Sequence, residues 1–153
     1  MFNIIVAQSR NRGIGMNNKL PWSISSDIKR FKNLTIGNEN NSVIMGRKTW
    51  ESIPKKYKPL CNRKNIVISR KYDYITDNVP VFDSIYSAYE YTKEMGFSQN
   101  WIIGGGEIYK TALREIEIDE IYVTQIDKVI NSDTFFPDIT GFCFYKLDET
   151  PYY

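Results

Sequence analysis

Asp27 stands out chemically because it is an acid set among apolar residues in the stretch SISSDIKRF, residues 23–31. With Ser25 or Ser26 as the cap, a helix through this stretch advances about 100° per residue. Asp27 then shares one arc of roughly 120° with Ile24, Ile28, Phe31 and Leu34, while Lys29, Arg30, Lys32 and Asn33 point away. An acid also stabilises a first helical turn through the helix dipole. Asp27 is therefore either an ordinary first-turn acid or the binding group of an apolar pocket.

A second candidate site lies in VIMGRKTWESIP, residues 43–54, where an apolar run reaches Gly46 and a helix begins. The first helical residues would be Arg47, Lys48 and Thr49. Cations at a helix N-terminus oppose the dipole, whereas the free backbone N–H groups there favour an anion. A solvated first turn is the alternative, but a bound phosphate explains the pattern better.

Two further strand ends carry weaker signals. Gly104, Gly105 and Gly106 separate a strand from a helix in IIGGGEIYKTAL, residues 102–113, and permit a close backbone approach to a ligand. A plain tight turn explains them equally well. Ser69 and Arg70 end the run KNIVISR, residues 64–70, and could hold another phosphate, although a surface arginine is the common alternative.

The elements that must position these residues alternate along the chain. Strand-like runs cover residues 2–8, 42–46, 64–70, 100–104, 119–126 and 142–147, and helical patterns cover 25–36, 47–53, 84–95 and 106–114. Asp83 or Ser84 is expected to cap the third helix, and Gly96 to end it. This alternation predicts one α/β domain over residues 1–153, with a twisted, mainly parallel sheet flanked by helices on both faces. Ligands of such sheets bind beyond the carboxyl ends of the strands.

Composition narrows the chemistry further. The 153 residues carry a net charge of +2, with no histidine and two cysteines, Cys61 and Cys143. Histidine-based catalysis is therefore excluded, and we expect no metal site, nucleic-acid partner or membrane span. The two cysteines and the start of the sequence, which has no signal peptide, suggest the cytoplasm. The basic run KKYKPLCNRKN, residues 55–65, favours a small anionic partner, although several of its lysines fit a solvated loop.

In this order, the motifs resemble the dihydrofolate reductase family over nearly the whole chain. They are GIGMNNKLPW at 13–22, Asp27 with Phe31 and Thr35, MGRKTWESIP at 45–54, PLCNRKN at 59–65, IIGGGEIY at 102–109, YVT at 122–124 and DTFFP at 133–137. The resemblance implies reduction of dihydrofolate to tetrahydrofolate, with NADPH giving a hydride to pterin C6 and water protonating N5.

The resemblance also assigns roles on the substrate side. Asp27 would bind the pterin with Thr124 as its hydroxyl partner, Trp22 would hold an ordered water, and Leu20 would form an apolar lid. Arg63 would clamp the α-carboxylate of the glutamate tail, with Lys58 as an assistant. The pocket walls would be Ile5, Ala7, Ile28, Phe31, Ile53, Leu60, Ile103 and Tyr109.

On the cofactor side, the resemblance implies NADPH rather than NADH, because Arg47, Lys48, Thr49, Ser69 and Arg70 match positions that hold its phosphates. Gly104 and Gly105 match a pair joined by a cis peptide. The remaining cofactor positions are Ala7, Ile14, Gly15, Asn18 and Leu20 in and before the nicotinamide loop, Gly46, and Gly106, Glu107 and Ile108 at the start of a helix.

The sequence departs from the family at the end, since DETPYY stands where a final hairpin and a last antiparallel strand would begin. A monomer without that strand, or a fragment of a fused dihydrofolate reductase–thymidylate synthase, is therefore expected. A catalytically impaired folate- or NADPH-binding scaffold, and a riboflavin-pathway reductase of the same fold, are the alternatives. Asp27 in its apolar arc and Arg63 favour folate over the latter.

Overall fold

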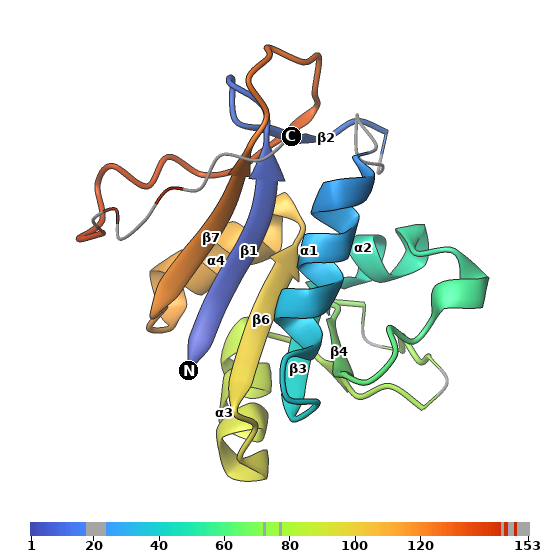
Figure 1. Ribbon diagram of the computed structural model, residues 1–153. Helices are drawn as coiled ribbons and strands as arrows, with labels where there is room; N and C mark the ends of the chain where they lie inside the picture. The colour runs from blue at the N-terminus through green and yellow to red at the C-terminus, as the bar shows by residue number, and fades with distance from the viewer. Residues whose placement is uncertain (18–23, 72, 77, 145, 147–148, 150–153) are drawn as a thin grey trace.

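A computed structural model gives the structure of the chain, and it describes residues 1–17, 24–71, 73–76, 78–144, 146 and 149. Six parallel strands form one sheet in the order β5-β4-β3-β6-β1-β7 (Figure 1). They are β1 Phe2–Gln8, β3 Asn41–Gly46, β4 Lys64–Ile68, β5 Val81–Phe82, β6 Gln99–Gly104 and β7 Glu120–Gln125. The predicted α/β fold with a mainly parallel sheet is confirmed.

Helices cover both faces of this sheet. They are α1 Ser25–Ile36, α2 Arg47–Ser52, α3 Ile85–Met95 and α4 Gly106–Glu115, and Lys55–Tyr57 forms a 3-10 helix. One core packs Phe31 and Leu34 of α1 and Trp50 of α2 against the sheet. The other core packs α3 and α4 against the opposite face (Figure 1). The central strands are buried from two sides, which is why Val43, Ile44 and Met45 are all 0% exposed.

Two short strands lie apart from the sheet and were not expected from the sequence. Strand β2, Gly13–Gly15, pairs antiparallel with β8, Thr134–Phe135. Strands of two or three residues carry too little hydrophobic alternation to be recognised in a sequence. Their pairing places Ile14 and Thr134 beside the carboxyl end of β1.

The caps of α3 are as expected. The Ser84 hydroxyl accepts a hydrogen bond from the Ser87 N–H at 3.1 Å, and Gly96 ends the helix with φ 73°. The expected cap of α1 is wrong, because neither Ser25 nor Ser26 caps it. Instead Ile24 holds the cap position, and its carbonyl accepts hydrogen bonds from the N–H groups of Asp27 and Ile28.

The expected strand at 142–147 is also wrong for the described residues of that segment. Phe142 lies in a turn, with its N–H donating to the Ile139 carbonyl at 3.0 Å. Among the described residues β7 pairs only with β1, so no strand hydrogen-bonds to its outer edge. The alternation in FCFYKL favours a strand, but a strand forms only where a neighbour supplies backbone partners.

No helix in the described part of the chain is both long and apolar enough to cross a bilayer. The described ranges also contain no group of three or more cysteine, aspartate and glutamate side chains placed to hold a metal ion.

Candidate active site

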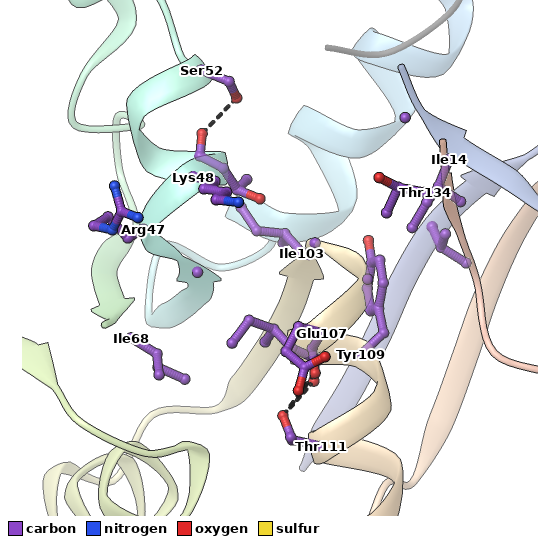
Figure 2. A pocket seen from close by; sticks show the side chains of 18 of the residues that line it. Ile14, Arg47, Lys48, Ser52, Ile68, Ile103, Glu107, Tyr109, Thr111 and Thr134 are labelled. Atoms are coloured by element: carbon purple, nitrogen blue, oxygen red, sulfur yellow. Dashed lines mark hydrogen bonds between the residues drawn. The ribbon is translucent and has the colours of Figure 1, made fainter. Parts of the chain in front are cut away.

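A cavity of about 1100 Å³ opens at the carboxyl edge of the sheet, between α1, α2 and α4 (Figure 2). Sites for small ligands commonly measure about 300–1,000 Å³, so this cavity lies at the upper end of that range. Most of the predicted site residues line it: Ile5, Ala7, Ile14, Gly15, Asp27, Ile28, Phe31, Gly46, Arg47, Lys48, Thr49, Ile53, Leu60, Ser69, Arg70, Ile103, Gly104, Gly105, Gly106, Glu107, Ile108, Tyr109 and Thr124.

Five predicted residues are not among this lining. Arg63 and Lys58 lie outside the residues that line the cavity, and Lys58 Nζ instead lies 4.9 Å from the centre of the Trp50 ring. Asn18, Leu20 and Trp22 fall outside the described residues, so their roles as loop, lid and water-holding groups stay predictions.

Asp27 and Thr124 meet at one end of the cavity. Asp27 is in the first turn of α1, and Thr124 is in β7 beside Ala7 of β1. The Thr124 hydroxyl donates to Asp27 Oδ1 at 2.6 Å. A carboxylate held at the edge of an apolar wall can pair with two adjacent N–H donors of a ligand, which is the strongest arrangement for such a pair.

The wall around Asp27 is apolar, but it is less buried than the helical pattern predicts. Phe31 and Leu34 are half-buried, and Ile28 is 55% exposed at the cavity. The expected core-facing stripe is therefore corrected to a face that borders an open cavity. A large apolar side chain left exposed beside a concave site is typical of a ligand-binding wall.

The loop that carries Leu60 and Arg63 is organised by Asn65. The Asn65 side chain is 4% exposed, accepts from the Leu60 N–H at 2.8 Å and donates to the Leu60 and Arg63 carbonyls at 2.9 and 3.0 Å. Asn62 adopts a positive φ of 58°, which asparagine tolerates well. This loop places Leu60 in the cavity wall.

Arg63 is held at the back of that loop. Its guanidinium donates to the Cys61 carbonyl at 2.8 Å and to the Thr35 hydroxyl at 3.0 Å. Burial lowers the pKa of Arg63, and the neighbouring Cys61 opposes that shift. Two separate motifs of the sequence, the one that contains Thr35 and the one that contains Arg63, are therefore in contact in the structure.

The opposite end of the cavity is lined by cationic side chains and by the backbone of several glycines. Figure 2 shows Arg47 and Lys48 on α2 across the cavity from Glu107, Tyr109 and Thr111 on α4. Arg47 Nη1 lies 2.6 Å from Glu51 Oε1, and its guanidinium stacks 5.8 Å from the centre of the Tyr74 ring. The pKa of Tyr74 is raised by burial and by Glu51, and Arg47 partly opposes this.

Glycines allow the elements around this end of the cavity to pack closely. Helix α4 starts at Gly106 without a side-chain cap, and a Cβ on Gly106 would lie 2.9 Å from Thr134 Cγ2. A Cβ on Gly46 would lie 2.9 Å from Ile108 Cγ1. The peptide bond between Gly104 and Gly105 is cis, and Gly104 has φ 123°. A ten-residue helix with an uncapped N-terminus beside two cations and several hydroxyls fits a polyphosphate.

The sequence did not single out several cavity residues. Ser52, Ile68, Lys71, Thr111, Arg114 and Thr134 also line it. They lie on helices α2 and α4, on strands β4 and β8 or just beyond them. Ser52 and Thr134 fall within the motifs MGRKTWESIP and DTFFP, but neither was assigned to the site. Only the fold brings them to the same edge of the sheet.

Tyr109 connects helix α4 to strand β1 through a buried hydrogen bond. Its hydroxyl is fully buried and donates to the Ile5 carbonyl at 2.8 Å, and its ring packs edge-on against Phe136 at 5.2 Å. Burial strongly raises the pKa of Tyr109. The hydroxyl therefore acts as a structural donor rather than as an acid at neutral pH.

We expect Tyr109→Phe to lower the free energy of unfolding by about 1–2 kcal/mol, because the Ile5 carbonyl loses a buried donor. Chemical denaturation measures this, and Tyr86→Phe, at an exposed tyrosine, is the matched control. An equal, small effect of both changes would contradict the structural role.

The same change has a pH signature. The folded protein keeps the Tyr109 proton to a higher pH than the unfolded chain does. Its contribution to stability is therefore complete below the unfolded pKa of about 10 and is lost as pH rises above it. Tyr109→Phe should flatten the alkaline loss of stability, measured by denaturation between neutral and alkaline pH. A loss as steep as in the parent chain would contradict this.

The fold and the cavity define an α/β protein with a two-part ligand site, an acid in an apolar wall at one end and a cationic, glycine-rich end opposite. The family model for dihydrofolate reductase matches residues 1–152 of the chain. The chain belongs to the dihydrofolate reductase family.

Named relatives are similar over most of this chain. It is 42% identical over 149 residues to bifunctional dihydrofolate reductase-thymidylate synthase 2 of Arabidopsis thaliana, covering 90% of this chain and 26% of the relative. It is 38% identical over 156 residues to dihydrofolate reductase of Heliothis virescens, covering 96% of this chain and 84% of the relative. A putative dihydrofolate reductase of Caenorhabditis elegans is 42% identical over 140 residues, covering 86% of this chain and 74% of the relative. The chain thus spans about a quarter of the plant protein and most of the other two.

Proposed function

We propose that this protein reduces 7,8-dihydrofolate to tetrahydrofolate with NADPH. The observation that carries the proposal is the pairing of Asp27 with Thr124 in an apolar wall, in one cavity with the cationic edge at Arg47 and Lys48. The names of the relatives, dihydrofolate reductase and its fusion with thymidylate synthase, support the same substrate.

At the substrate end, the Asp27 carboxylate binds the adjacent N–H and amino groups of the pterin in a bidentate, charge-assisted pair. Thr124 donates to Asp27 and fixes the carboxylate plane. Ile5, Phe31 and Ile103 exclude water from the ring faces and orient it. Lacking histidine, the chain orients the pterin and leaves protonation of N5 to water.

At the other end, the residues present fit a dinucleotide phosphate. Gly105, Gly106 and the first turn of α4 would hold the pyrophosphate, and Arg47, Ser69 and Arg70 would hold the 2′-phosphate. When bound, NADPH supplies a hydride from its nicotinamide to pterin C6. The protein supplies orientation and electrostatics for that transfer.

Other functions are distinguishable. The predicted location is the cytoplasm. A stand-alone monomer and the reductase part of a fused chain are both compatible with this proposal, since the relatives include stand-alone and fused proteins. A non-catalytic scaffold would bind folate or NADPH without turnover. A riboflavin-pathway reductase would use an aminouracil substrate, so the substrate that supports turnover separates the two reductases.

We expect the purified chain to oxidise NADPH only when dihydrofolate is added, and not when a riboflavin-pathway aminouracil is added. Loss of the NADPH absorbance band measures the rate, and NADPH alone is the control. Binding of both ligands without turnover would instead establish the scaffold, and oxidation dependent on the aminouracil would establish the alternative reductase.

A further inference from the structure

Arg30 lies beside the substrate end of the cavity, contrary to its expected position on the solvent face of α1. The residue is half-buried, and its Nη1 donates a hydrogen bond to the Thr124 hydroxyl at 3.3 Å. That hydroxyl in turn donates to Asp27 Oδ1 at 2.6 Å. A guanidinium is therefore two hydrogen bonds away from the carboxylate that is proposed to bind the pterin.

The order of donors in this chain of hydrogen bonds is fixed. A guanidinium carries only donors, so the Thr124 oxygen must accept from Arg30. The one proton of the hydroxyl is then available for Asp27, and the arrangement favours the charged carboxylate as its acceptor. Hydrogen bonds in series polarise one another, so the cation strengthens the bond that Thr124 makes.

The other charged and titratable groups near Thr124 come from β7. Tyr122 shares its face of the sheet and donates to Glu120 at 3.1 Å. The pKa of Tyr122 is raised by burial and by Glu120, and Arg30 lowers it, so the guanidinium also acts on this neighbour. The β1 residues that pair with this face of β7 are Asn3, Ile5 and Ala7, and none of them carries a charge; nor does Trp101 of β6, which pairs with Asn3. Among the described residues around Thr124 and Tyr122, Arg30 therefore supplies the positive charge, and Asp27 and Glu120 supply the two negative charges.

We propose that Arg30 is a positioning residue that holds Thr124 as a hydrogen-bond donor to the Asp27 carboxylate and thereby sets the upper part of the pH range in which dihydrofolate is reduced. This inference rests on the proposed function. If the Arg30 guanidinium is removed, the pair formed by Asp27 and the pterin loses a nearby positive charge and therefore binds a proton more readily. The pH profile of the variant should move to higher pH.

The test compares Arg30→Met, which removes charge and hydrogen bond, with Arg30→Gln, which keeps a donor, and Arg30→Lys, which keeps the charge. Lys29→Met removes the same charge from the exposed neighbour on α1 and is the matched control. We expect Arg30→Met and Arg30→Gln to shift the midpoint of the pH profile of kcat/KM upward by about 0.5–1 unit. Arg30→Lys and Lys29→Met should shift it by less than about 0.2 unit, because both keep a cation at position 30.

A second readout does not depend on turnover. Calorimetry of folate binding in two buffers of different ionisation enthalpy gives the number of protons taken up on binding. We expect greater uptake near neutral pH for Arg30→Met and Arg30→Gln than for the parent chain. If Arg30→Met does not fold, Arg30→Gln alone carries the comparison.

Two results would overturn the inference. In the first, folate binds and is reduced, but Arg30→Met and Arg30→Gln keep the parent pH profile and proton uptake. In the second, Arg30→Lys shifts the profile as far as Arg30→Met does, which would assign Arg30 a packing role. Failure of the parent chain to bind folate would reject the proposed function instead, so the two failures are distinct.

Discussion

Replacing Asp27 with asparagine is expected to lower kcat/KM for dihydrofolate about 100-fold or more at neutral pH. Asparagine keeps the shape of the side chain and an oxygen for the Thr124 hydroxyl, so the fold should persist. It has lost the charge, and its amide nitrogen would face a donor of the pterin. The bidentate pair that orients the ring is therefore broken.

The same variant should recover part of its rate at low pH, because dihydrofolate that is already protonated needs less help from a carboxylate. Steady-state kinetics from acidic to alkaline pH measure this, and circular dichroism checks the fold. Asp127→Asn, at an exposed carboxylate paired with Arg10, is the matched control and should leave the profile unchanged. Near-parental turnover of Asp27→Asn across the pH range would remove Asp27 from the mechanism.

Replacing Arg47 with alanine is expected to weaken binding of NADPH roughly 10- to 100-fold, and binding of NADH by less than about threefold. Arg47 lines the cationic end of the cavity, where its guanidinium can leave Glu51 to pair with the 2′-phosphate. NADH lacks that phosphate, so it loses no comparable contact. Titration calorimetry or fluorescence titration with the two dinucleotides gives the ratio.

Glu51→Gln supplies the control for this comparison. It removes the partner of Arg47 on α2 and leaves Arg47 in place, so NADPH affinity should stay the same or increase. An equal loss of NADPH and NADH affinity in Arg47→Ala would refute the assignment of the 2′-phosphate to this residue.

The sequence predicted those parts of the fold that depend on local patterns. The buried parallel strands β1, β3, β4 and β6 appear as apolar runs, and the Ser84 and Gly96 caps have short-range chemistry. Residues 142–147 alternate as a strand should, yet the described part forms none, because pairing depends on a neighbour that local pattern does not specify. The predicted cap of α1 was wrong for a similar reason. Ile24 occupies the cap position through its backbone carbonyl alone, and no side-chain type in the sequence marks such a cap.

For the site, the sequence identified the residues at strand ends but not their partners. Asp27 was recognisable as an acid in an apolar arc, and Arg47 as a cation at a helix start. Arg30 was misplaced, because helical periodicity puts it just outside the arc and cannot show that its long side chain reaches Thr124. Residues such as Thr134 come to the cavity only through tertiary pairing of β2 with β8.

The central claim, hydride transfer to the pterin in this cavity, is tested most directly by following the hydrogen itself. NADPH deuterated at nicotinamide C4, on each face in turn, is incubated with the chain and dihydrofolate, and the product is analysed by NMR. We predict tetrahydrofolate with one deuterium at C6 from one of the two faces and none from the other. Product without deuterium at C6 from either form, or no product despite binding of both ligands, would contradict the account.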